Sequence, residues 1–214
     1  MLEVSGTFAL DPAITLRMAP EAESSDADLM RRTAAGDRDA FAALYRRHNG
    51  TVYRFARLMT GCQAAAEDIV QEAFLALMRD AGRYDPQRAS LPTYLYGVSR
   101  HQTRRWLSRA RRFVTFTGED AAATALAPAA DVHGDMERQD EVGRLRRAIL
   151  TLPSRYREAI VLCDLQDVSY ADAAATLGCP VGTVRSRLHR ARAMLGERMR
   201  VAERAQDAVM RCAV

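Results

Sequence analysis

The chain has 214 residues, of which 48% are hydrophobic and 27% charged, a balance typical of globular proteins rather than disordered ones. The formal net charge is +4, which favours an acidic partner. The four cysteines are far apart and lack the spacing of a zinc site or a disulfide framework. No apolar run approaches the roughly 20 residues of a membrane span, and the N-terminus lacks a signal-peptide pattern, so we expect a cytoplasmic protein without membrane insertion.

Residues 1–27 contain prolines, a glycine and several acids without a period, which predicts a disordered acidic leader. From 28 to 112 apolar residues recur at steps of three and four, which predicts a helical N-terminal domain. Within it we expect helix breaks at Gly36, at residues 48–50 and at residues 60–61. The expected third and fourth helices span 64–80 and 93–112.

Residues 113–138 are rich in alanine and acids and are broken by glycine and proline, which predicts a flexible linker. Residues 139–200 are again helical, with expected helix starts near 140, 153, 170 and 180, and a tail follows at 201–214. No strand-like alternation occurs. The sequence therefore predicts an all-α fold of two small helical domains joined by a linker.

Charge is arranged in blocks along these segments. Residues 100–116 carry six arginines and no acid, whereas residues 117–141 carry seven acids and one arginine. Residues 185–200 again carry six arginines against one glutamate. This alternation predicts separate surfaces for separate partners.

The most specific motif lies in residues 169–192 and predicts a helix-turn-helix. Ser169 and Asp172 have the spacing of a capping box at a helix start. Gly178 favours a helix end because glycine tolerates left-handed backbone, and Pro180 suits the first turn of a second helix. A helical wheel of that second helix gives a narrow apolar stripe, expected to be buried: Val184, Leu188, Ala191 and Leu195.

The opposite face of this second helix carries Ser186, His189 and Arg190, flanked by Arg185 and Arg187. In the major groove such a face presents guanidinium forks to guanine and phosphate. Thr183 lies in the first turn, where free backbone amides can hold a phosphate. A solvated basic face is the alternative, but the agreement of cap, turn and apolar stripe favours DNA reading.

Leu152–Pro153 and Arg157, followed by residues 179–192, resemble the C-terminal DNA-binding domain of extracytoplasmic-function (ECF) RNA polymerase sigma factors. The resemblance implies that the second helix reads the minus-thirty-five element of promoter DNA. It implies base contacts from Ser186, His189 and Arg190.

Residues 66–74 resemble the polymerase-binding helix of the same family. On the wheel, Asp68, Glu72 and Leu75 point outward, with Gln71 beside them, and an exposed leucine between two carboxylates suits a partner face. The resemblance implies the partner, a basic coiled coil on the largest subunit of core RNA polymerase. An ordinary amphipathic helix is the alternative.

The fourth helix carries Arg100, His101 and Arg104 on one side, and Tyr84 and Tyr94 precede or open it. Arginines mixed with aromatic rings suit a single strand, whose bases stack while cations hold phosphates. In ECF sigma factors the matching segment melts the minus-ten element and captures a flipped base in the preceding loop. Three positions differ from the residues that are frequent in the family: Tyr94 stands for Trp, His101 for Asn and Arg105 for Asp. Because these positions border the expected pocket, the identity of the base recognised at the minus-ten element stays open.

The resemblance covers about residues 28–200 and implies a sigma factor that directs promoter-specific transcription initiation. It also implies an anti-sigma factor as a further partner, and a stress or envelope-response regulon. The sequence shows no nucleophile–base set and no metal spacing, so we expect no enzymatic activity, no metal and no cofactor. The alternatives are a stand-alone helix-turn-helix regulator, a nucleic-acid enzyme and an adaptor that only binds polymerase. The outward acidic face disfavours the first of these.

Overall fold

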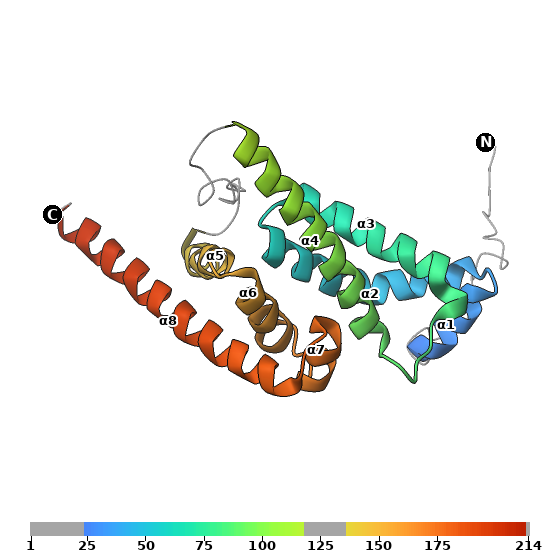
Figure 1. Cartoon of the computed structure of the whole chain (residues 1–214). Coiled ribbons are helices and arrows are strands. Elements are labelled where there is room, and N and C mark those ends of the chain that lie inside the picture. Colours follow the sequence, from blue (N-terminus) through green and yellow to red (C-terminus); the bar gives the residue numbers. More distant parts are fainter. Residues whose placement is uncertain (1–23, 118–135, 213–214) are drawn as a thin grey trace, which may run out of the picture.

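The structure, a computed structural model, describes residues 24–117 and 136–212. Within these two ranges the chain forms helices and no strand, which confirms the all-α prediction (Figure 1). Most of the expected leader and linker falls on residues 1–23 and 118–135, which lie outside the described residues. None of the described helices is both long and apolar enough to cross a membrane.

The N-terminal helices form one packed group (Figure 1). Ser25 caps the first helix by accepting a hydrogen bond from the amide of Asp28 at 3.1 Å, so this helix begins two residues before the expected domain boundary. Asp37 caps the second, and Gly61 ends it in the left-handed conformation with φ 73°. The elements are α1 (Asp26–Ala34), α2 (Arg38–Thr60), α3 (Gln63–Asp80), η2 (Ala81–Arg83) and α4 (Leu91–Thr117).

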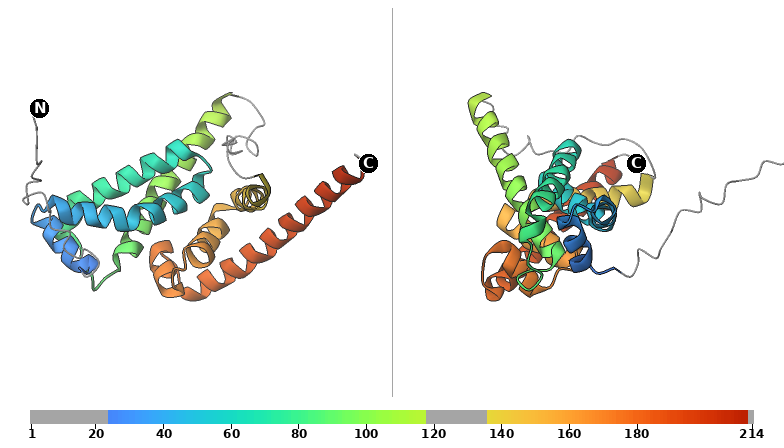
Figure 2. Two further views of the ribbon diagram at one scale, coloured as in Figure 1. Left: turned by 180° about the vertical axis from the view of Figure 1, so that it is seen from behind. Right: turned by 90° about the vertical axis from the view of Figure 1, so that its right-hand side faces the viewer.

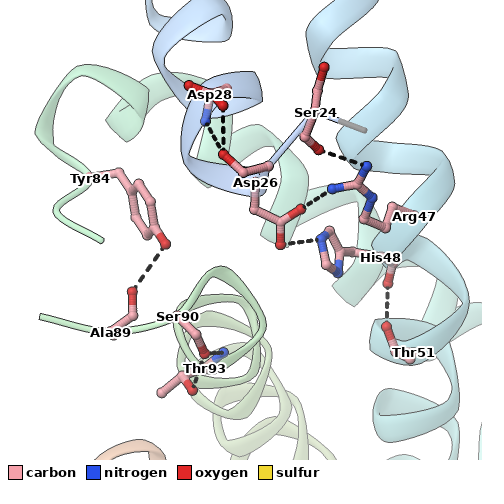
Figure 3. Close-up of polar contacts among 11 residues, drawn as sticks. Ser24, Asp26, Asp28, Arg47, His48, Thr51, Tyr84, Ala89, Ser90 and Thr93 are labelled. Atoms are coloured by element: carbon pink, nitrogen blue, oxygen red, sulfur yellow. Dashed lines mark hydrogen bonds and ion pairs between the residues drawn. The ribbon is translucent and has the colours of Figure 1, made fainter. Parts of the chain in front are cut away.

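The helix break expected at residues 48–50 is wrong, because α2 runs through them without interruption. His48 is buried, and its Nε2 lies 2.9 Å from Oδ2 of Asp26 in α1. Arg47 donates to the other oxygen of that carboxylate at 2.6 Å (Figure 3). Leu44 and Val52, one turn or more to either side, are both buried. Tertiary contacts thus hold the helix where local sequence favours a turn.

The C-terminal helices form a second group. They begin close to the expected positions, and the last helix continues beyond residue 200 as far as Cys212. Cys163 and Cys62 are both half-buried, Cys163 against the core of this group and Cys62 at the start of α3. The elements are α5 (Met136–Leu150), α6 (Ser154–Ile160), η3 (Val161–Leu165), α7 (Tyr170–Leu177) and α8 (Val181–Cys212).

The two groups pack against each other, with the C-terminal helices along one side of α2 and α4 (Figure 2). Phe55 and Met59 of α2 and Tyr96 of α4 belong to the same buried cluster as the core of the C-terminal group. Arg157 of α6 is buried and donates to the backbone carbonyl of Met59 at 2.6 Å. The shared core fixes how the two groups are oriented.

Candidate nucleic-acid and polymerase interfaces

Helices α7 and α8 form the expected helix-turn-helix. The hydroxyl of Ser169 accepts from the amide of Asp172 at 3.1 Å and donates to its carboxylate at 2.6 Å, which confirms Ser169 as the cap at the start of α7. Gly178 ends α7 with φ 64°, the left-handed geometry expected of it. Pro180 lies one residue before α8, and its carbonyl accepts from the amide of Val184 at 3.2 Å. Three of the four stripe residues are buried and the fourth, Leu195, is half-buried.

The outer face of α8 carries the six expected DNA-binding residues. Four are exposed, namely Arg185, Ser186, His189 and Arg190, and the other two, Thr183 and Arg187, are half-buried. The hydroxyl of Ser186 donates to the carbonyl of Thr183 at 3.0 Å, which leaves its oxygen as an acceptor toward solvent. The face therefore presents two exposed guanidinium groups beside two smaller polar side chains.

Neighbouring side chains orient the arginines of this face, and sequence reasoning missed them. The guanidinium of Arg185 lies over the ring of Tyr170, 5.8 Å from its centroid. Arg190 lies beside Tyr156, and its hydrogen bond lowers the pKa of that phenol. These contacts join α8 to α6 and α7. The pattern of residues within α8 alone therefore could not predict them.

Arg192, two residues after Arg190 on α8, is held differently. It forms two hydrogen bonds to the carboxylate of Asp164, at 2.8 and 2.7 Å, and this carboxylate raises the pKa of the guanidinium above its ordinary value. Asp164 comes from η3, 28 residues earlier in the chain. A forked pair of this kind fixes the orientation of the guanidinium.

A pocket of about 800 Å³ lies between the loop 84–90 and the first turns of α4. Tyr84 and Tyr94 line it, with ring centroids 6.0 Å apart, and His101 is exposed at its wall. Tyr84 donates to the carbonyl of Ala89 at 3.0 Å, which closes the loop on itself (Figure 3). Burial raises the pKa of both tyrosines, so both rings are neutral near pH 7. The structure thus brings three of the five expected minus-ten residues to one concave site.

The other two expected minus-ten residues contact the C-terminal group. Arg104 donates to Oε1 of Glu158 at 3.1 Å. Arg100 lies 3.1 Å from Oε2 of the same carboxylate, an ion-pair contact without hydrogen-bond geometry, and donates to the carbonyl of Thr176 at 3.2 Å. The side chain of Arg100 is only 15% exposed, so it is not the open cation that the helical wheel predicts.

Helix α3 exposes all four residues expected to bind polymerase: Asp68, Gln71, Glu72 and Leu75. Gln71 and Leu75 line a groove of about 530 Å³ between α2 and α3, whereas Asp68 and Glu72 lie outside its lining. Tyr45, Leu75 and Met78 line that groove, and their side chains are exposed although they are large and apolar. Tyr45 and Met78 escaped sequence reasoning, because only the packing of α2 on α3 brings them beside Leu75.

Two family models match this chain, one in each helical group. The model of the family described as Sigma-70 region 2 matches residues 44–113. The model described as Sigma-70, region 4 matches residues 143–195. The first range contains the α3 face and most of α4, and the second contains the helix-turn-helix.

Similar proteins are found among sigma factors of several bacteria. Over 178 residues the chain is 39% identical to the ECF RNA polymerase sigma factor SigM of Mycobacterium tuberculosis, with 81% of this chain and 84% of that protein covered. It is 29% identical over 178 residues to the ECF RNA polymerase sigma factor SigW of Bacillus subtilis, with 80% and 95% covered.

Solved structures resemble most of the fold. CnrH, in complex with the cytosolic domain of CnrY, matches with a TM-score of 0.64 and 25% identity over 83% of this chain and 99% of that one. The sigma factor RpoE of Bartonella quintana, in complex with the anti-sigma factor NepR, matches with a TM-score of 0.64 and 25% identity over 75% and 97%.

Two helical groups carrying regions 2 and 4 in this order define an RNA polymerase sigma factor. The chain belongs to the family of ECF RNA polymerase sigma factors. As a sigma factor it binds core RNA polymerase and directs transcription initiation at promoters. The alternative of a stand-alone helix-turn-helix regulator is thereby set aside.

Proposed function

We propose a division of labour between the two helical groups, with residues 28–112 as the polymerase-binding and minus-ten domain and residues 139–200 as the minus-thirty-five domain. The polymerase contact is made by the α3 face of Asp68, Gln71, Glu72 and Leu75. What supports it is that Asp68 and Glu72 are exposed on the same helix whose Gln71 and Leu75 line an apolar groove, since exposed apolar side chains next to charged ones mark protein interfaces. The acids of this face select a basic partner surface.

Promoter DNA is bound at two separate surfaces. The α8 face reads the minus-thirty-five element in the major groove, through Ser186, His189 and Arg190, with Arg185 and Arg187 on phosphates and Thr183 at the helix N-terminus. Orientation of Arg185 by Tyr170 supports this assignment, because a preset guanidinium loses less freedom on binding.

The minus-ten surface consists of Tyr84, Tyr94, Arg100, His101 and Arg104. The pocket between the loop 84–90 and α4 has the volume and the aromatic lining to take one unstacked base. Arginines on the next turns of α4 then hold the backbone of the melted strand. Because His101 and Tyr94 line this pocket, they set which base it accepts.

Membership of the sigma factor family also suggests how this protein is regulated and where it acts. Two of the structural neighbours are complexes, with CnrY and with the anti-sigma factor NepR, and we infer that a regulator of this kind binds this chain. A stress or envelope-response regulon is the proposed output. The protein acts in the cytoplasm, where polymerase and promoter are, and works by binding alone, without enzymatic chemistry.

Run-off transcription with purified core polymerase tests these assignments, on genomic fragments that include the protein's own upstream region. Asp68→Arg/Glu72→Arg is expected to abolish core binding and therefore initiation. Arg190→Ala is expected to keep core binding and lose about 1–3 kcal/mol of promoter binding, roughly five- to 150-fold.

Each variant has a matched control. Glu141→Arg/Glu197→Arg makes the same charge reversal at exposed acids outside the α3 face, and Arg200→Ala removes an exposed arginine of α8 beyond the DNA face. Both controls should initiate like the wild type. If the α3 variant binds core as tightly as its control, the polymerase assignment is wrong. If Arg190→Ala and Arg200→Ala behave alike, the base contact is wrong.

A further inference from the structure

Asp80 is an acid in a pocket whose other features suit nucleic acid. It lines the pocket of about 800 Å³ together with the rings of Tyr84 and Tyr94 and with two exposed arginines, Arg83 and Arg88. A carboxylate in this place repels the phosphates that the arginines attract, so it lowers the affinity for every strand alike. Such an acid has a use when it discriminates between bases, because specificity is often built by repelling the wrong partner.

The carboxylate of Asp80 is held in one orientation. Asp80 is the last residue of α3 and directly precedes η2, so regular backbone fixes its position on both sides. The hydroxyl of Tyr94 on α4 donates a hydrogen bond to Oδ2 of Asp80 at 3.2 Å. Burial and the charge of Asp80 raise the pKa of Tyr94, so the phenol keeps the proton that it donates. Among the contacts of the described residues, Oδ1 of Asp80 accepts no hydrogen bond, so this oxygen is available to a ligand.

The three side chains at this wall offer a base acceptors and no free donor. Asp80 takes the hydroxyl hydrogen of Tyr94, and the carbonyl of Ala89 takes that of Tyr84 at 3.0 Å. Each tyrosine oxygen then keeps only lone pairs for a ligand, and an ionised carboxylate is an acceptor only. The ring centroids lie 6.0 Å apart, so the rings supply aromatic surface while the polar atoms beside them accept. A base that enters here must therefore present a donor to Asp80.

We propose that Asp80 selects the base that enters this pocket, by admitting bases with an exocyclic amino group and excluding thymine. The inference rests on the proposed minus-ten role of the pocket and names the class of base that it takes. The amino groups of cytosine, adenine and guanine can each donate a hydrogen to Oδ1 of Asp80. Thymine instead presents carbonyl oxygens on both sides of its single N–H. A carbonyl against the carboxylate sets two acceptors together without a hydrogen between them, which lowers the affinity.

The test measures base preference in the assembled initiation complex. Core polymerase with the full chain transcribes a promoter, found by run-off transcription, whose minus-ten positions are randomised, and a barcode in each transcript identifies its template. With the wild type, one position should show thymine depleted about ten-fold relative to the three amino-bearing bases, within the range for one mismatched base. Asp80→Asn keeps an acceptor for Tyr94 and gains a donor for thymine, so the depletion at that position should fall to about two-fold or less.

Two further variants separate selection from a structural role. Asp85→Asn makes the same change at an exposed acid of the pocket rim, whose Oδ1 accepts from the amide of Gln87 at 2.9 Å, and should leave every preference unchanged. Tyr94→Phe keeps the ring and removes the hydroxyl that orients Asp80, so a smaller relaxation at the same position is expected. If circular dichroism shows that Asp80→Asn does not fold, Tyr94→Phe decides in its place.

Unchanged thymine depletion in folded Asp80→Asn would overturn the selection by Asp80, and so would relaxation produced by Asp85→Asn alone. Gly97→Leu tests the pocket itself, because a Cβ at Gly97 meets no atom within 4 Å and a leucine there can fill pocket space. This variant should lose initiation whichever base is present. If it initiates like the wild type, no base enters the pocket, and the minus-ten assignment and the selection fail together. If it loses initiation while Asp80→Asn keeps the wild-type preference, only the selection is overturned.

Discussion

Arg157 is the residue whose replacement should cost the most stability. Its guanidinium is buried and donates to three backbone carbonyls, those of Met59, Leu150 and Leu152. Met59 and Leu150 lie in the last turns of α2 and α5, where carbonyls have no partner within their own helix. Two helix C-termini thus direct their negative ends at one cation, which is why a buried arginine is tolerated here.

Arg157→Met should remove these three bonds while nearly filling the space. Each hydrogen bond to a charged group contributes about 1.5–3 kcal/mol net, and unpaired buried carbonyls carry their own desolvation penalty. The methionine recovers part of this by burying apolar surface. We therefore expect the free energy of unfolding to fall by about 3–5 kcal/mol, the range for breaking a buried charged network.

Urea unfolding followed by far-ultraviolet circular dichroism measures this loss. Arg155→Met is the matched control, because this exposed neighbour lies over the ring of Tyr156, 4.7 Å from its centroid, a contact of about 0.5–1 kcal/mol, and bonds no backbone carbonyl of the other helices among the described contacts. A lower m-value for Arg157→Met is also expected, since the bond to Met59 couples the two helical groups. Equal losses for the two variants would refute the capping role of Arg157.

Two further predictions concern the helix-turn-helix. Gly178→Ala should cost about 1–2 kcal/mol, because a Cβ at φ +64° is strained even in open space, whereas Gly182→Ala, inside α8 and equally unobstructed, should stabilise by about 0.5–1 kcal/mol. Thermal melts of the pair check this, and a shift of the same sign for both would contradict it. Asp164→Asn should free Arg192 for a phosphate and steepen the salt dependence of promoter binding by about one unit of slope, as measured by anisotropy. An unchanged slope would mean that Arg192 does not reach DNA.

Much of the candidate site was predictable because its determinants are local. Caps, turns and faces of a helix depend on residues within four positions of each other, so the wheel placed Asp68 and Glu72 outside and Val184 and Leu188 inside. A helical wheel also identified the exposed face of α8, although it contains no information about the helices that pack against α8. The roles of those exposed residues in binding stay predictions.

Other parts depended on contacts between distant segments. The turn predicted at residues 48–50 failed, because the bond from His48 to Asp26 of α1 and the burial of Val52 outweigh the local preference of Asn-Gly for a turn. Arg100 was expected to be open, because a wheel of α4 contains no information about Glu158. Tyr45 and Met78 could be recognised as part of the groove beside Leu75 only after α2 was packed on α3.

The sequence by itself determined that this protein is helical, where its two motif-bearing halves lie and which faces of α3 and α8 are polar. These properties follow from short-range periodicity and from the chemistry of single residues. The tertiary structure alone decided that the two halves share a core, that Arg157 joins them, and that Glu158 faces the arginines of α4. Such contacts join residues up to about a hundred positions apart, and no local pattern encodes which of many arginines a buried carboxylate will meet.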